Sequence, residues 1–146
     1  MTLVRQIGIE DFAFIQQLAG EERSFTVPSD YILWMLSRLY PETCLVATDS
    51  RRTPVGYLLG LVKDTTLFIW QLAITDRGSQ TGASNVLLKE VKRVAQAGGF
   101  SEICFTMQPR IAKLWGFRAA KEVFGVFPEN DGPGINGEPH YRIALR

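Results

Sequence analysis

The sequence has few of the residues that build disulfide frameworks and metal centres. Two cysteines, Cys44 and Cys104, and one histidine, His140, stand among 146 residues. Both cysteines lie inside apolar runs, where a free thiol behaves as a small hydrophobic group, and two cysteines do not make a disulfide framework. One histidine with two scattered cysteines does not supply a zinc ligand set. We therefore expect neither a disulfide scaffold nor a metal site.

The chain also lacks a charge excess and a long hydrophobic run. Its 16 basic and 15 acidic residues leave a formal net charge of +1, so there is no electrostatic basis for binding nucleic acid or an anionic membrane. No apolar run approaches the roughly 18 residues that span a bilayer. The N-terminal stretch MTLVRQIGIEDF has no basic region followed by an apolar core, which a secretory signal requires. We expect a cytoplasmic protein without nucleic-acid or membrane partners.

Apolar side chains are present in the amount that one core needs. Hydrophobic residues make up 46% of the sequence, and a domain of roughly 150 residues buries about 68–70% of the surface of its unfolded chain. We expect residues 1–146 to form a single domain.

Hydrophobic periodicity and turn residues divide the chain into short strands and helices. Apolar residues recur at helical spacing after residues 9–11, and Ser29-Asp30 is a typical start for a second helix. A third helix follows residue 84 and stops at Gly98-Gly99, residues 109–114 form at most a short helix, and Gly116-Phe117 is a turn. Expected strands cover residues 3–8, 44–48, 55–62, 67–74, 103–107, 122–127 and 141–145. The order β-α-α-β-β-β-α-β-α-β-β predicts an α/β domain with a mixed sheet.

The polar stretch DRGSQTGAS, residues 76–84, separates an almost continuously apolar strand from the helical run NVLLKEVKRVAQ. A helix N-terminus has unpaired N–H groups and a partial positive charge, and small side chains let a phosphate approach that backbone. There is no glycine-rich loop ending in Gly-Lys-Ser/Thr and no G-x-G-x-x-G, which disfavours a P-loop or a dinucleotide site. The stretch is either an anion cradle or a surface loop that binds nothing.

This combination of strand, loop and helix resembles the GNAT N-acetyltransferase superfamily over essentially the whole chain. The resemblance implies a centrally splayed, mixed sheet of six to seven strands flanked by about four helices, with acetyl-CoA as the cofactor. The strand FIWQLAI and the preceding ETCLVATDSRRTPVGYLLG are particularly similar to the diaminobutyrate acetyltransferases of ectoine synthesis.

The superfamily's phosphate-binding pattern, Gln/Arg-x-x-Gly-x-Gly/Ala, falls on residues 79–84, where only Gly82 matches strictly. In the superfamily the amides of this loop bind the pyrophosphate of acetyl-CoA and the preceding strand pairs with its pantetheine arm. The cofactor-binding residues that the resemblance implies are Leu72, Ala73, Ile74, Ser79, Gln80, Thr81, Gly82, Ala83 and Ser84.

The activity that the resemblance implies is direct transfer of an acetyl group to the amine of a small-molecule or amino-acid-like acceptor. Two departures concern catalysis. Ala112 replaces the tyrosine that many members use as a general acid. The central strand carries Gln71 where many members have a carboxylate that acts as a general base. A catalytically degenerate acyl-CoA-binding module is therefore the alternative. The resemblance leaves a homodimer open.

Three residues are candidates for the chemistry. Gln71 either orients a water or the substrate or makes a cross-strand hydrogen bond. Thr106 lies on the strand facing the splay. It either forms a hydrogen bond with the cofactor or substrate or is an ordinary β-branched strand residue. His140 is either a base or an exposed turn residue. Cys104 is a poor covalent acetyl carrier, because no base neighbours it in sequence.

Candidates for the acceptor site come from segments that the resemblance places around the cleft. Glu22 is a substrate-binding residue or part of a solvated face, and Tyr31 and Trp34 wall the pocket or belong to the core. Residues 129–139, ENDGPGINGEP, are expected to form a long connection inside the last hairpin, either a lid over the site or a solvated loop.

Overall fold

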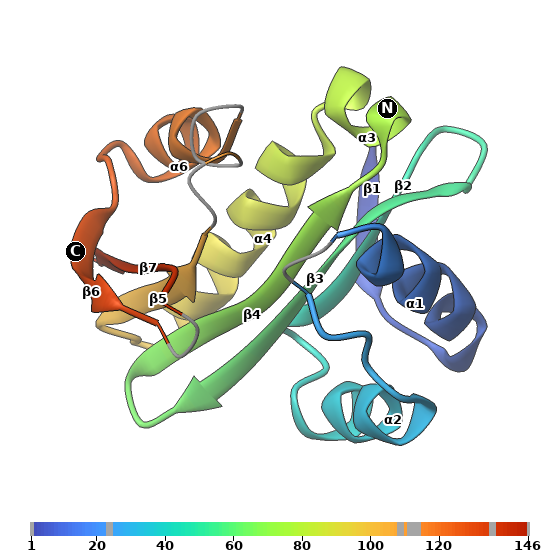
Figure 1. The fold of residues 1–146 in the computed structure, drawn as a ribbon, viewed down its shortest axis with the longest axis horizontal. Helices are drawn as coiled ribbons and strands as arrows, with labels where there is room; N and C mark the ends of the chain where they lie inside the picture. The colour runs from blue at the N-terminus through green and yellow to red at the C-terminus, as the bar shows by residue number, and fades with distance from the viewer. Residues whose placement is uncertain (1, 23–24, 108–109, 111–114, 135–136, 146) are drawn as a thin grey trace.

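A seven-stranded mixed sheet is the centre of the protein (Figure 1). The computed structural model describes residues 2–22, 25–107, 110, 115–134 and 137–145. The strand order is β1-β2-β3-β4-β5-β7-β6, and every neighbouring pair is antiparallel except β4 and β5. The strands are β1 (Leu3–Gln6), β2 (Cys44–Thr48), β3 (Pro54–Lys63), β4 (Thr66–Ile74), β5 (Glu102–Thr106), β6 (Glu129–Pro133) and β7 (Pro139–Ala144). The expected fold class is confirmed.

The described helices cover both faces of the sheet. They are the 3-10 helix η1 (Ile9–Asp11) and the α-helices α1 (Phe12–Glu21), α2 (Asp30–Leu39), α3 (Asp76–Thr81), α4 (Ala83–Ala97) and α6 (Phe117–Phe124). No helix in this part of the chain is both long and apolar enough to cross a membrane, and no cluster of metal-ligating side chains is found among the same residues.

Two hydrophobic cores form because successive residues of a strand point to opposite faces of the sheet. On β2, Leu45 and Ala47 belong to the core on the α4 side of the sheet, while Cys44 and Val46 belong to the core on the side of α1 and α2. All four side chains are buried, so β2 reads as a continuous apolar run, as strands covered on both faces do.

Local signals define the ends of α2 and α4 as expected. The Ser29 side chain accepts a hydrogen bond from the Ile32 amide at 3.2 Å and caps α2. Gly98 caps the C-terminus of α4, and Gly99 follows with a left-handed φ of 70°.

Two expectations for the C-terminal part are wrong. The turn at Gly116-Phe117 and the strand over residues 122–127 are replaced by α6, which buries Ala119, Ala120 and Val123 at helical spacing. A short apolar run does not distinguish a strand from a buried helical segment. The short helix expected at 109–114 falls on residues of which only Arg110 is described.

The long connection expected at residues 129–139 is also wrong, because β6 pairs with β7 there. Glu129 lies opposite Arg142, Asn130 opposite Tyr141, and a register shift follows around Gly132, whose φ is 101°. Glycine and proline are tolerated in this strand because it is at the sheet edge and irregular.

Candidate active site

The site begins where two neighbouring strands separate. β4 and β5 pair in parallel from Thr66 and Glu102 to Ile69 and Phe105, and the pairing stops there. β4 continues for five more residues toward α3 (Figure 1). A cleft of about 670 Å³ opens beside this part of β4, between it and the end of β5, with α4 and α6 contributing to its wall. The remaining backbone of β4 therefore presents a strand edge to the cleft.

The stretch at residues 76–84, expected to be a loop, is mostly helical. Thr75 caps α3 by accepting a hydrogen bond from the Gly78 amide at 3.0 Å. Gly82, with φ 74° and ψ 29°, ends α3 and begins α4. The apolar pattern gave no sign of α3 because Gly78 is its only buried residue.

The N-terminal end of α4 is open to a ligand. The first amides of a helix have no intrahelical acceptor, and the first bond that closes this turn runs from the Val86 amide to the Gly82 carbonyl oxygen at 3.2 Å. Gly82 makes no side-chain cap, and a Cβ atom placed there would meet nothing within 4 Å. Unpaired amides, the positive end of a helix dipole and open space fit a diphosphate group.

The other residues expected to bind the cofactor divide into two groups. Leu72, Ala73 and Ile74 all line the cleft from β4. Ser79, Gln80 and Thr81 are exposed on α3, whereas Ala83 and Ser84 are buried at the start of α4. The strand edge and the end of α4 together fit an extended arm with a phosphate group at its end.

Gln71 is buried and both ends of its amide are used (2% exposed). Its Oε1 accepts a hydrogen bond from the Tyr57 hydroxyl at 2.9 Å, and its Nε2 donates to the Thr26 carbonyl oxygen at 2.7 Å. Burial, with a contribution from the negative charge of Glu22, raises the pKa of Tyr57, so the phenol remains a donor. The cross-strand hydrogen bond is thus present, and Gln71 also lines the cleft, so its role toward the substrate stays a prediction.

Thr106 and His140 lie opposite each other on β5 and β7, and both line the cleft. The imidazole of His140 stacks on Phe68, with 6.1 Å between the ring centroids and 13° between the planes. Its Nδ1 is 3.6 Å from Oδ2 of Asp131 on β6. The sheet thus places a histidine and a hydroxyl in the cleft wall, with the carboxylate of Asp131 behind the histidine.

Glu22 also lines the cleft, and its carboxylate forms an ion pair with Arg110 at 3.6 Å. Tyr31 and Trp34 are not among the residues that line the cleft. They are 68% and 43% exposed, and they stack on each other on the outer side of α2. Because α2 buries Leu33 and Leu36 instead, its aromatic side chains face away from the cleft.

Several lining residues had no signal of function in the sequence. Phe68 and Trp70 sit in an apolar strand in which the lining and the core positions look alike. Phe25 and Thr26 lie in a polar connection whose position depends on the hydrogen bond from Gln71.

Comparison with known proteins gives both sequence relatives and structural neighbours. No family model matches the chain. The chain is 30% identical to the L-2,4-diaminobutyric acid acetyltransferase of Nocardia farcinica, over 97% of this chain and 79% of that protein. It is 31% identical to the protein of the same name from Chromohalobacter salexigens, over 77% of this chain and 60% of that one.

Solved structures share the fold at lower identity. The diaminobutyrate acetyltransferase of Paenibacillus lautus, in complex with L-2,4-diaminobutyric acid and coenzyme A, matches with a TM-score of 0.80 and 21% identity, covering 99% of this chain and 95% of that one. A GNAT-superfamily phosphinothricin acetyltransferase of Sinorhizobium meliloti, in complex with AcCoA, has a TM-score of 0.72 and 15% identity, covering 99% and 88%.

Proposed function

Because this chain belongs to the L-2,4-diaminobutyric acid acetyltransferase family of the GNAT superfamily and is an acetyl-CoA-dependent N-acetyltransferase of small amines, we propose that its acceptor is a short α-amino acid with a second amine on its side chain. L-2,4-diaminobutyrate is the compound that represents this class. The observation that carries the proposal is the 30% identity to a relative of that name along 97% of the chain.

The cofactor would occupy the open end of α4 and the edge of β4. The amides that follow Gly82 would bind the pyrophosphate, and the backbone of residues 72–74 would pair with the pantetheine arm. Bound acetyl-CoA supplies an activated acetyl group as a thioester. The N–H groups of β4 near Leu72 to Ile74 are the donors available to the thioester oxygen.

The acceptor would enter from the side that carries the carboxylates. Glu22 and Glu138 both line the cleft, and a carboxylate in a partly desolvated site attracts an ammonium group more strongly than one in water. Phe68 and Trp70, both on β4, supply an apolar wall of the same cleft. A diamine is suited to this arrangement because one amine can remain charged while the other reacts.

His140 is the base that the geometry favours. Its Nδ1 lies 3.6 Å from Oδ2 of Asp131, so Nε2 is the nitrogen that would accept the proton that the amine loses. Thr106, directly opposite on β5, is placed to orient the same amine by a hydrogen bond. The new N–C bond would then form as the C–S bond breaks, with the amine proton passing to His140 and coenzyme A leaving as a thiolate that takes a proton from solvent, without a covalent enzyme intermediate.

Release of free thiol from acetyl-CoA across a set of amines tests this function. We expect L-2,4-diaminobutyrate to give the highest kcat/KM, above 2-aminobutyrate, which lacks the second amine, and above putrescine, which lacks the carboxylate. Thiol release that stays at background for every amine, with acetyl-CoA still bound, would indicate the binding module instead.

The role of His140 has its own test in the same assay. His140→Ala should lower kcat by roughly 10²–10⁴-fold, the usual contribution of a positioned base, with KM for acetyl-CoA unchanged. A His140→Ala enzyme with wild-type kcat would remove His140 from the mechanism without affecting the assignment of the acceptor.

A further inference from the structure

α3 buries almost no apolar surface against the rest of the protein. Gly78 is its only buried residue, and the other five residues are exposed to solvent. Burial of apolar surface is the main force that docks a helix on a sheet. Since α3 lacks it, polar contacts have to fix the position of this helix, and therefore of Gly82 and of the open end of α4.

The start of α3 is joined to β3 through the backbone. The Thr75 amide donates to the Val55 carbonyl oxygen at 2.9 Å, and the Thr75 hydroxyl donates to the same oxygen at 3.1 Å. Gly78 lies so close that a Cβ atom there would clash with this oxygen. At the other end, the Thr2 hydroxyl donates to the Thr81 carbonyl oxygen at 3.1 Å.

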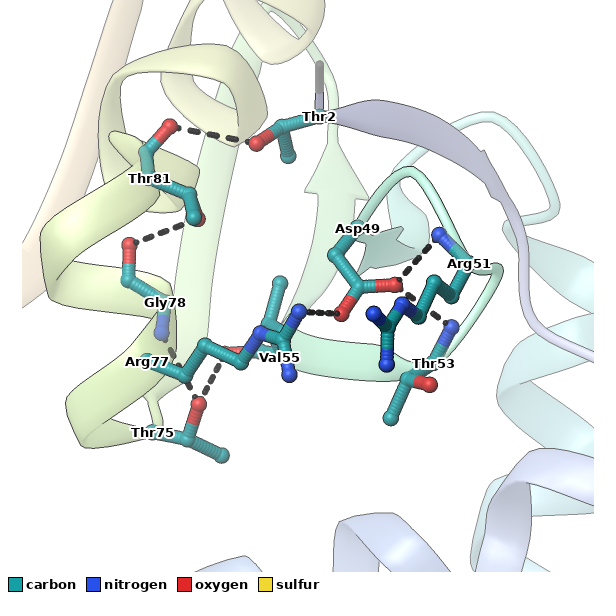
Figure 2. Close-up of polar contacts among 9 residues, drawn as sticks. All are labelled: Thr2, Asp49, Arg51, Thr53, Val55, Thr75, Arg77, Gly78 and Thr81. Atoms are coloured by element: carbon teal, nitrogen blue, oxygen red, sulfur yellow. Dashed lines mark hydrogen bonds and ion pairs between the residues drawn. The ribbon is translucent and has the colours of Figure 1, made fainter.

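The remaining contact is an ion pair between Asp49 and Arg77 (Figure 2). Asp49 is 3% exposed and lies in the turn between β2 and β3. Its Oδ1 accepts hydrogen bonds from the Arg51 and Thr53 amides, each at 2.9 Å. Among the described residues, its Oδ2 has no hydrogen bond, and its partner is the guanidinium of Arg77, with Nη2 at 3.0 Å.

The two oxygens of Asp49 therefore have separate roles. Oδ1 holds the turn, while Oδ2 pairs with Arg77 on the helix that precedes the open end of α4. Hydrogen bonds from the Thr53 and Arg51 amides, and the charge of Arg77, hold the pKa of Asp49 below its ordinary value. The carboxylate is thus charged at neutral pH, and a buried charge needs its partner.

We propose that Asp49 and Arg77 are positioning residues for the cofactor: their ion pair fixes α3 and thereby aligns the amides after Gly82 with the pyrophosphate of acetyl-CoA. This inference rests on the proposed placement of the cofactor. Neither residue touches the reacting groups. The contact therefore acts on the binding of acetyl-CoA and leaves the acceptor and the proton transfer unaffected.

Asp49→Asn isolates the helix contact, because the asparagine oxygen can still accept from both turn amides while its NH₂ group replaces the charged oxygen that faces Arg77. Arg77→Gln removes the other partner from an exposed side chain (55% exposed), so this variant should fold. We expect each variant to raise KM for acetyl-CoA roughly tenfold, which corresponds to the loss of about one charge-assisted hydrogen bond between an amide after Gly82 and the pyrophosphate. KM for the acceptor and kcat should stay within about twofold of wild type.

Three comparisons sharpen the experiment. Arg77→Lys keeps the positive charge and should raise KM for acetyl-CoA less than Arg77→Gln does. The double variant should be no worse than either single variant, since both remove the same interaction. Arg93→Gln, which breaks the exposed pair between Arg93 and Glu90 on α4, should leave all three kinetic constants unchanged.

Two results would overturn the inference. One is an unchanged KM for acetyl-CoA in both Asp49→Asn and Arg77→Gln. The other is a parallel change in both KM values and kcat together with a lower melting temperature, which would reflect general destabilisation. A wild-type enzyme that neither binds acetyl-CoA nor releases thiol would instead overturn the proposed function, so the two failures are distinguishable.

Discussion

Gln71 joins three separate parts of the protein through one side chain. It lies on β4, accepts from Tyr57 on β3 and donates to Thr26 in the connection between α1 and α2. Glu22, at the start of this connection, and Thr26, inside it, both line the cleft. The amide therefore joins this wall of the cleft to the sheet.

We predict that Gln71→Leu lowers the free energy of unfolding by about 2–5 kcal/mol, since it leaves the Tyr57 hydroxyl and the Thr26 carbonyl oxygen without their partner. KM for the acceptor should rise while KM for acetyl-CoA stays the same. Denaturant unfolding and steady-state kinetics measure these effects. Tyr57→Phe, which removes one of the two hydrogen bonds, is the matched control and should lower the free energy of unfolding by less than Gln71→Leu does. Equal changes in both KM values would contradict this role.

Cys104 provides a second prediction, which concerns the reaction route. Burial, and then the nearby negative charge of Glu102, raises the pKa of its thiol to about 11, and burial raises that of Cys44 to about 11 as well. At pH 7–8 both thiols are protonated and weakly nucleophilic. Cys104→Ser should therefore retain most of kcat, and the native protein should react with thiol reagents only slowly. A loss of kcat to background would indicate a covalent acetyl carrier.

At the residue scale, the sequence predicted the role of a side chain only where its partner is a close neighbour in the chain. Ser29 caps α2 as predicted, because a cap depends on neighbours three residues away. The partner of Gln71 lies 45 residues away at Thr26, and no pattern in one sequence encodes that distance. Tyr31 and Trp34 show the same limit, since helical spacing does not say which side of α2 faces the sheet.

At the scale of elements, the junction between α3 and α4 depends on one glycine conformation. Gly82 has φ 74°, where residues with a Cβ atom are strained, and the space around it is open. Gly99, just beyond the other end of α4, has φ 70° and equally open surroundings. The chain thus contains a matched pair of positions, one at the expected cofactor site and one away from it.

We predict that Gly82→Ala and Gly99→Ala each cost about 1–2 kcal/mol of stability, the strain of a left-handed alanine. Only Gly82→Ala should also raise KM for acetyl-CoA, by roughly tenfold or more, because it disturbs the amides that would bind the pyrophosphate. Thermal unfolding and kinetics on both variants test this. Equal KM values for the two variants would place the phosphate site elsewhere.

Long or continuously apolar elements were predicted well, whereas short, polar or edge elements were not. β2 matches its predicted bounds, Cys44–Thr48, because all five residues are buried. α3 was predicted to be a loop because its only buried residue is a glycine. β6 was also predicted to be a loop because it contains Gly and Pro, which an edge strand tolerates. Part of α6 was predicted to be a strand because a run of about eight residues is too short to distinguish the helical from the strand periodicity.

At the scale of the whole molecule, ligand binding is linked to stability. Acetyl-CoA at 100 times its Kd should add about 2.7 kcal/mol to the free energy of unfolding, which for a chain of this length raises Tm by roughly 5–10 °C. S-acetylpantetheine, which lacks the pyrophosphate, should give a smaller shift at the same concentration. Equal shifts from the two compounds would show that the end of α4 does not bind the pyrophosphate.

The parallel pairing of β4 with β5 covers four residue pairs, and it is what joins the two halves of the sheet. The junction lies at the end of β4 away from α3, so the part of β4 beyond it, which pairs with β3 but not with β5, acts as a lever about 16 Å long, at roughly 3.3 Å per residue over five residues. A tilt of about 3° between the halves would displace the phosphate end of the site by about 1 Å, by the geometry of that lever. Packing at Leu67 and Ile103, both fully buried at the junction, therefore sets the width of a cleft whose far end lies several residues away.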